Sequence, residues 1–431
     1  QKDELYEYYG SSNLYPIYGV KLNRKTFQPE GGVVPLIALN DEEHGWERFG
    51  ENNDNTFMQP FMEGAFMTKH KNTYYLQYGG PGTEFSGYGD GVYTSKNPLG
   101  PFVYQSHNPF SYKPGGFARG AGHGATFQDA NSTFWHVSTI VIGTKNNFER
   151  RLGIWPAGID EEGVLYSNTA YGDYPTFLPS QNKDHLKGSF SGWMLLNYNK
   201  PVSVSSTLGG FQPNYAVNED IKTYWSAKTG NKGEWLISDL GERSTIRAIQ
   251  INYADQDVTL MGKPENTVGH KYLITVSDNL KEWKVIVDKS KNSKDVPHEY
   301  VELEKPVIGR YLKIENIQMP TGKFALSGFR VFGKGNGEAP APVKNFVPLR
   351  VAPKTKGERR NVWFKWEQEP LADGYVIYFG KSPNQLYGSV MVYGKNEYYL
   401  NALDRSDAYY FQIESFNSNG ISPRTPVIRV E

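Results

Sequence analysis

The sequence contains no cysteine among its 431 residues. This absence excludes disulfide bridges, thiolate zinc sites and a cysteine nucleophile. Excess charge is also missing, because 46 Lys and Arg balance 46 Asp and Glu. The chain as a whole therefore has no charge-based attraction to nucleic acid or to anionic membranes. No run of 18 apolar residues occurs either, so we expect no membrane span.

A basic segment followed by an apolar stretch, the pattern of a secretory signal peptide, is absent as well. We expect that any such peptide has been removed. Helical periodicity is nearly missing, whereas short strand-like runs flanked by Gly, Pro, Asn or Asp recur, as at 73–78, 134–137, 247–251 and 374–378. This pattern predicts an all-β chain of sandwiches, barrels or propellers.

Aromatic residues are abundant, with 30 Tyr, 23 Phe and 9 Trp. They suit two roles, since aromatic rings fill β cores and also stack against the C–H faces of sugars. Shifts in composition divide the chain into segments 1–190, 191–335 and 343–431. A small, Pro- and Gly-rich linker at 333–342 separates the last two segments.

The C-terminal segment carries Trp366, the strand 374–378 and Tyr409 followed by a Ser- and Asn-rich close. With these features, residues 343–431 resemble a fibronectin type III domain. The resemblance implies a β-sandwich in which Tyr409 is the corner tyrosine. No chemistry is visible in this segment, so we expect it to be a spacer.

The middle segment contains the runs 216–225 and 233–241, then 272–277, 309–314 and 326–333. These runs resemble a discoidin-type (coagulation factor V/VIII C-type) domain, the fold of family 32 carbohydrate-binding modules. The resemblance implies a β-sandwich at 191–335 and a possible structural Ca²⁺ held by Asn218, Asp220 and Thr223, since oxygen ligands suit a hard cation. Ser327 stands where the family often has a Glu ligand. The alternative is a capped turn without metal.

The N-terminal segment places Glu63 between Met62 and Gly64, at the entry to an apolar run. Burial there would raise the pKa of the Glu63 carboxyl, as a general acid for glycosidic cleavage requires. The alternative is an exposed carboxylate at a strand edge. Local sequence alone does not separate these two interpretations.

Several ordered motifs accompany Glu63. The aromatic strand at 74–76 follows it, and then come the Ser-x-x-Pro-x-Gly-Pro pattern at 95–101, the Gly-His-Gly of 122–124 and the double arginine at 150–151. Together they resemble glycoside hydrolase family 43, the five-bladed β-propeller glycosidases, with Ala65 in place of the usual Pro. The resemblance implies that Glu63 is the general acid. It also implies that His123 contacts the substrate or a central metal ion and that Arg151 pairs with a site carboxylate or a sugar hydroxyl, the alternatives being a structural histidine and a surface salt bridge. Tyr88 is a further candidate for substrate binding, as are Trp46 and Asp54 in the polar and aromatic run 46–55, for which the alternative is a solvated loop.

The family uses three carboxylates, and two of them precede the motif at 8–12. The chain begins only seven residues before Tyr8. We therefore expect blade one, part of blade two and the catalytic base to be missing, which leaves a partial propeller at 1–190. Candidates for a substitute base are Glu51, Asp54, Glu84, Asp90 and Asp173.

The resemblance predicts a secreted, periplasmic or cell-surface glycoside hydrolase that inverts the anomeric centre. The expected substrates are polysaccharides or oligosaccharides with β-xylosyl, α-L-arabinofuranosyl or β-galactosyl groups, and no cofactor is required. An alternative is a non-catalytic carbohydrate-binding protein with a degenerate propeller. A third possibility is an adhesion or scaffold protein. Fold alone does not separate them, because function lies in the site.

Overall fold

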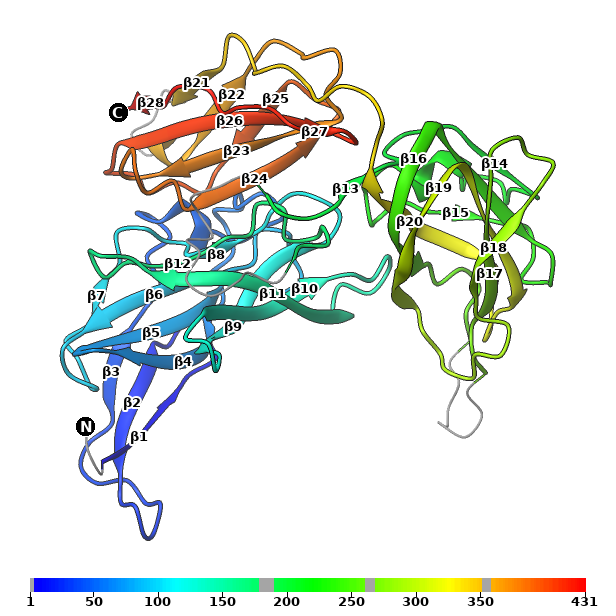
Figure 1. Ribbon diagram of the computed structural model, residues 1–431. Coiled ribbons are helices and arrows are strands. Elements are labelled where there is room, and N and C mark those ends of the chain that lie inside the picture. Colours follow the sequence, from blue (N-terminus) through cyan, green and yellow to red (C-terminus); the bar gives the residue numbers. More distant parts are fainter. Residues whose placement is uncertain (1–3, 178–189, 260–267, 351–357) are drawn as a thin grey trace.

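The computed structural model describes residues 4–177, 190–259, 268–350 and 358–431 (Figure 1). Strands dominate these residues, which contain short 3₁₀ turns but no α-helix. The expected all-β class is thus confirmed. No helix in the described part of the chain is long and apolar enough to cross a membrane.

The N-terminal part consists of three antiparallel sheets that follow one another along the chain, in the manner of propeller blades (Figure 1). The first sheet contains β1 (Leu5–Tyr9), β2 (Ile17–Leu22) and β3 (Val34–Ile37). The second contains β4 (Glu63–His70), β5 (Thr73–Gly80), β6 (Gly89–Ser95), β7 (Val103–Tyr104) and β8 (Ser111–Tyr112). The third contains β9 (Arg119–Gln128), β10 (Phe134–Val141), β11 (Arg150–Ile159) and β12 (Leu165–Ser167).

The middle part is one sheet in the order β13-β20-β16-β19-β17-β18, in which β14 also pairs with β16 and β15 with β20. Its alternating Ile, Val and Leu side chains point inward and form a separate apolar core. The strands are β13 (Met194–Leu195), β14 (Val202–Val204), β15 (Trp225–Ser226), β16 (Trp235–Tyr253), β17 (Lys271–Ser277), β18 (Lys284–Asp288), β19 (His298–Gln318) and β20 (Ala325–Lys334).

The C-terminal part is a sandwich of two sheets, and the Tyr409 hydroxyl accepts a hydrogen bond from the backbone N–H of Asp404 (2.9 Å), as a tyrosine corner would. The fibronectin type III assignment itself stays a prediction. One sheet contains β21 (Val347–Arg350), β22 (Val362–Lys365) and β25 (Glu397–Leu400). The other contains β23 (Gly374–Gly380), β24 (Gly388–Tyr393), β26 (Tyr409–Asn417), β27 (Gly420–Ile421) and β28 (Ile428–Val430).

The C-terminal sandwich is not a free spacer, which corrects the expectation from sequence. Trp46 and Tyr78 of the N-terminal part belong to the same apolar core as Phe364 and Phe411 of the sandwich. The linker is also held in place, because its Gly337 N–H donates to a side chain of the sandwich. Burial of a shared apolar core explains why the sandwich docks instead of extending into solvent.

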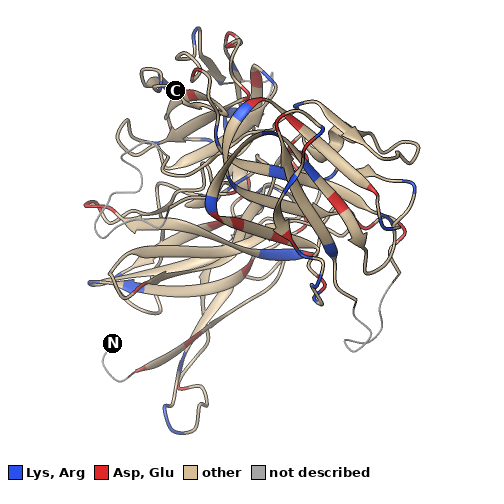
Figure 2. Ribbon diagram, turned by 45° about the vertical axis from the view of Figure 1, so that its right-hand side comes forward, with Lys and Arg blue, Asp and Glu red and all other residues tan. Residues whose placement is uncertain are grey.

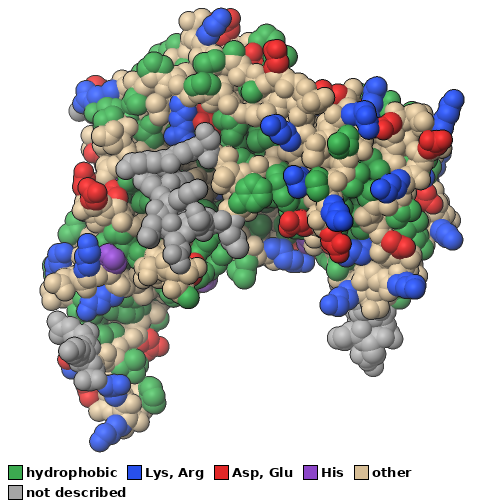
Figure 3. Space-filling model, viewed as in Figure 1, with side chains coloured by type: hydrophobic (Ala, Val, Ile, Leu, Met, Phe, Trp, Pro, Cys, Tyr) green, Lys and Arg blue, Asp and Glu red, His purple; other side chains and the backbone are tan. Residues whose placement is uncertain are grey.

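Residues of both charge signs are distributed along the chain (Figure 2), and their side chains are interspersed on the face of the molecule in Figure 3. The pairs that matter for assembly are buried at the junctions. At the sandwich junction, His44 Nδ1 lies 2.8 Å from Asp404 Oδ1, and the fully buried Glu47 accepts a hydrogen bond from Tyr78. Burial raises the pKa of Glu47 to about 7. Burial lowers the pKa of His44, but the hydrogen bond and charge of Asp404 outweigh it and leave that pKa raised.

We expect this junction to weaken as pH rises from 5 to 8. Glu47 and His44 both bind protons more tightly in the folded state, so their contribution to stability is lost as pH rises through their folded pKa values. The thermal midpoint should fall by on the order of a few degrees. Glu47→Gln, which keeps a hydrogen-bonding side chain, should flatten the decline between pH 5 and 7. The exposed neighbour Glu42→Gln serves as a control, and an equal slope in both variants would contradict the expectation.

Candidate active site

Glu63 begins β4 and lies in register with Gly79 of β5, which in turn pairs with Asp90 of β6. Directly paired residues of antiparallel strands point to the same side of the sheet, so the two carboxylates share a face and are separated by the bare backbone of Gly79. A side chain at Gly79 would collide with the backbone of His123 and the hydroxyl of Tyr88. Glycine at this position therefore allows His123 to lie over the sheet between Glu63 and Asp90.

The Glu63 carboxylate has two near neighbours. The Tyr88 hydroxyl donates a hydrogen bond to Oε1 at 2.6 Å, and His123 Nδ1 lies 3.6 Å from the same oxygen. The Glu63 side chain is 19% exposed and that of His123 is 47% exposed. Glu63 is thus half-buried but open to a ligand, beside two of the residues predicted to bind substrate.

His123 owes its position to a bulge in β9. Its φ of +54° is in the left-handed region, and the β9–β10 register shifts at this point. Such bulges redirect a side chain and are frequent beside active sites. The flanking Gly122 and Gly124 are required, because a Cβ at either would collide with Tyr88 or with the Asp90–His136 pair. This local geometry explains the Gly-His-Gly sequence.

A buried chain of hydrogen bonds lies beneath the site. Asp90 Oδ2 is 2.8 Å from His136 Nε2, and His136 Nδ1 is 2.9 Å from the Thr126 hydroxyl. The chain continues through Gln77 to Thr68, so it joins β6, β10, β9 and β5 to β4, the strand that carries Glu63. Asp90 is 1% exposed. It therefore supports the site from below and is not placed to activate water.

The environment of Glu63 differs from the one expected from sequence. The neighbouring His123 lowers its pKa, burial raises it, and the Tyr88 hydrogen bond and the charge of Arg150 lower it further, so that the pKa of Glu63 is lowered overall. Glu63 in turn raises the pKa of His123. The expected rise by burial is wrong for the ligand-free protein, because a cation and a hydroxyl outweigh it.

The arginine that reaches the site is Arg150 and not Arg151. Arg150 donates to the Thr83 hydroxyl and its charge acts on both Glu63 and His123. Arg151 is 46% exposed and pairs with Glu149 on the opposite face of β11. Side chains alternate between the two faces of a strand, so the neighbouring residues Arg150 and Arg151 point to opposite faces and only one of them can reach the site.

Two further candidates lie away from Glu63. Trp46 is completely buried and its indole N–H donates to the Tyr104 hydroxyl at 2.9 Å. It fills the core beneath the C-terminal sandwich, so its assignment to substrate is wrong. Asp54 is exposed on the preceding loop, and no contact among the described residues joins it to Glu63. Of the other candidate bases, Asp173 is buried and 2.9 Å from Lys113, whereas Glu51 bonds Ser86.

The candidate calcium loop forms its own hydrogen bonds. The Asn218 amide nitrogen donates to the Thr223 hydroxyl at 2.8 Å, and that hydroxyl donates to the Asp220 carbonyl. Asp220 also accepts from the Lys222 N–H and faces Arg119. No cluster of three His, Asp or Glu suited to a metal occurs in the described residues. This arrangement is that of a capped turn and does not fit Ca²⁺ as it stands; a calcium site remains a prediction.

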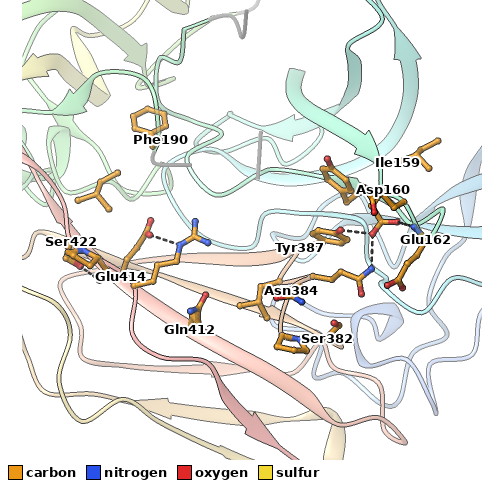
Figure 4. A pocket seen from close by; sticks show the side chains of 18 residues that line it. Ile159, Asp160, Glu162, Phe190, Ser382, Asn384, Tyr387, Gln412, Glu414 and Ser422 are labelled. Carbon is orange, nitrogen blue, oxygen red and sulfur yellow. Dashed lines mark hydrogen bonds and ion pairs between the residues drawn. The ribbon is translucent and has the colours of Figure 1, made fainter. Parts of the chain in front are cut away.

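A wide cavity of 970 Å³ lies between β12 and the C-terminal sandwich, away from Glu63 (Figure 4). Its polar groups are already used to join the two parts. Asp160 accepts hydrogen bonds from Gln385 and Tyr387 of the sandwich, and Glu414 of the sandwich accepts one from Tyr171 of the N-terminal part. This cavity therefore belongs to the domain junction.

Two segments of the chain match known families. Residues 2–165 match the family model of glycosyl hydrolases family 43. Residues 201–328 match that of the F5/8 type C domain. The chain thus contains one segment that is similar to glycosyl hydrolases family 43 and a second that is similar to the F5/8 type C domain. The first match contains Glu63, Tyr88, His123 and Arg150, and it supports a glycoside hydrolase. Neither match extends into the C-terminal sandwich.

No curated protein matches the chain. Among solved structures, a glycoside hydrolase is 19% identical with a TM-score of 0.40, over 77% of this chain and 68% of that one. An endo-1,4-beta-xylanase from Bacteroides thetaiotaomicron is 24% identical with a TM-score of 0.33, over 39% of this chain and 55% of that one. The family 32 module of Clostridium perfringens NanJ, solved with galactose, is 19% identical with a TM-score of 0.28, over 32% and 98%. Likeness at this level carries no information on activity.

We expect His123→Gln to move the alkaline limb of the pH–rate profile to higher pH. A general acid works only while protonated, so the rate falls as pH rises through its pKa. Removing the cation that lowers the pKa of Glu63 raises that pKa. The measurement is kcat/KM for an aryl glycoside between pH 3 and 8, with His70→Gln at the far end of β4 as the control. An unchanged alkaline limb in His123→Gln would show that the two groups are not coupled.

Proposed function

We propose that this protein is an inverting glycoside hydrolase that acts on β-xylosyl, α-L-arabinofuranosyl or β-galactosyl groups of polysaccharides, with Glu63 as the general acid. The observation that supports it most is the half-buried Glu63 carboxylate, 2.6 Å from the Tyr88 hydroxyl, within a segment that matches family 43. Tyr88 holds the carboxylate toward the open side of the sheet, and His123 and Arg150 supply positive charge for binding hydroxyl groups.

Hydrolysis requires Glu63 to start protonated, although its pKa is lowered in the ligand-free protein. A bound sugar excludes water from the site, and loss of water raises the pKa of a carboxyl group. The acid then protonates the leaving oxygen while a carboxylate roughly 6.5–9.5 Å away activates water from the other side. Asp90 does not fill that second role, because it is buried and bonded to His136.

The lowered pKa of Glu63 and the unsuitability of Asp90 as a base also favour a second function. A carboxylate held ionised by His123, without an accessible partner carboxylate among the described neighbours, would bind sugar hydroxyls instead of cleaving the bond. The chain would then be a non-catalytic carbohydrate-binding protein. Secretion to the periplasm or cell surface is proposed under either function.

The test is hydrolysis of aryl β-xyloside, α-L-arabinofuranoside and β-galactoside by the intact chain, with proton NMR to identify the anomer formed first. Cleavage with inversion supports the hydrolase. Binding of the same glycosides without turnover supports the non-catalytic alternative.

A further inference from the structure

A smaller cavity of 380 Å³ lies where all three parts of the chain meet. The segment between β8 and β9 forms one wall, the loop 218–220 a second, and strands β24 and β25 a third. Its volume is at the small end of the roughly 300–1,000 Å³ typical of ligand sites, and domain junctions often hold such sites. It therefore has room for one or two sugar units and not for a long chain.

Arg119 lines this cavity, and part of its guanidinium group is not hydrogen-bonded within the described residues. Its Nε donates to the Gly116 carbonyl at 3.1 Å, which fixes the side chain. Its terminal nitrogens lie 4.0 Å from Glu51 and 3.7 Å from Asp220. These distances are too long for hydrogen bonds. Within the described residues, the two terminal nitrogens thus remain available to a ligand.

Three tyrosine hydroxyls around the cavity are also available. Tyr198, Tyr398 and Tyr399 line it, and none of their hydroxyls has a hydrogen-bond partner in the part of the chain that the structure describes. Burial raises the pKa of Tyr398 to about 12, so this hydroxyl remains a donor at neutral pH. The 970 Å³ cavity differs, since its Asp160 and Glu414 carboxylates are fully engaged.

The charges around the cavity favour an uncharged ligand. Arg119 and Lys395 are balanced by Glu51 and Asp220 in the same lining, and the third carboxylate there, Glu219, is paired with the buried Arg330. Aromatic rings next to unengaged hydroxyl and guanidinium groups are the combination that a polyhydroxylated ring satisfies, because its C–H face is apolar and its rim both donates and accepts.

We propose that this three-way junction is a second carbohydrate site, which binds one or two neutral sugar units through Arg119 and Tyr398. The site is independent of Glu63 and of hydrolysis. A glycan bound there would contact all three parts at once and would stabilise their arrangement, since a ligand that binds only the assembled form shifts the equilibrium toward it.

The experiment uses the full-length Glu63→Gln variant, which lacks the proposed general acid. Binding is therefore measured without hydrolysis, and the result does not depend on whether the protein is a hydrolase. Methyl β-xyloside, methyl α-L-arabinofuranoside and methyl β-galactoside are the probes, and glucuronate is the charged control. Saturation-transfer NMR gives the affinity, and hydrogen exchange gives the location. We expect at least one neutral glycoside to bind and to protect the amides of 112–120 and 393–401.

Two added variants test the contacts. Tyr398→Phe removes only a hydroxyl and should weaken binding by about 3- to 10-fold, and Arg119→Met should weaken it further. Tyr300→Phe, on the exposed face of the F5/8 type C domain, should have no effect. Circular dichroism and thermal unfolding show whether each variant is folded. If Arg119→Met does not fold, Tyr398→Phe still tests the proposal. Absence of binding, a preference for glucuronate, unaltered affinity in Tyr398→Phe, or protection only elsewhere would overturn the proposal.

Discussion

Replacing Glu63 with Gln should lower the hydrolysis of glycosides with poor leaving groups by about 10²–10⁴-fold, the usual contribution of one general acid. A glutamine keeps the size of the side chain and accepts the Tyr88 hydrogen bond, but it has no proton to give to the leaving oxygen. Dinitrophenyl glycosides depart without that proton, so their cleavage should change much less. The measurement is kcat/KM for a methyl, a nitrophenyl and a dinitrophenyl glycoside of the same sugar.

Glu7→Gln provides the matched control, because Glu7 is an exposed glutamate on the neighbouring sheet. It should leave all three rates unchanged. An equal loss on all three leaving groups in Glu63→Gln would assign Glu63 to substrate binding and not to proton transfer. A chain that turns over none of them, while still binding the sugar, would favour the carbohydrate-binding alternative.

Replacing Arg330 with Met should lower the free energy of unfolding by about 3–5 kcal/mol, the usual cost of breaking a buried ion pair. Arg330 is 1% exposed on β20, and it donates to both oxygens of Glu219 at 2.8–2.9 Å and to the Asp173 carbonyl at 2.8 Å. It thereby links the middle part of the chain to the N-terminal part. Its removal leaves Glu219 buried without its cation.

The free energy of unfolding is measured by denaturant titration, with tyrosine and tryptophan fluorescence as the signal. Arg243→Met is the control, because Arg243 pairs with Asp278 at 3.1 Å where both side chains are largely exposed. Such surface pairs contribute little. A similar small effect in the two variants would show that the buried pair does not hold the domains together.

Motif order in the sequence predicted the meeting of Glu63 and His123, since ordered motifs of a known family come with a common fold. The neighbours that set the charge state of Glu63 were harder to predict. The pKa of Glu63 depends on a bulge that turns His123 toward it and on the choice between Arg150 and Arg151. Each is a matter of one residue along a strand, and local sequence does not specify it.

Contacts between segments that are distant in the chain could not be predicted from the sequence. Trp46 has the aromatic character of a sugar-binding residue, but its surroundings include residues more than 300 positions later in the chain, such as Phe364. The residues next to Trp46 in the sequence give no indication that it packs in one core with Phe364. For the same reason the C-terminal segment, which shows no chemistry of its own, was expected to be a spacer.

The docking of the C-terminal sandwich bears on how this architecture can be recombined. A protease cut in the linker at 333–342 would break one covalent connection, but the two fragments would still share an apolar core and the Arg48–Asn361 hydrogen bond. They should co-purify after cleavage. Grafting the sandwich onto another enzyme, or deleting it from this one, would instead uncover Trp46 and its neighbours. The first and last parts of the chain should therefore be transferred together when the domains are recombined.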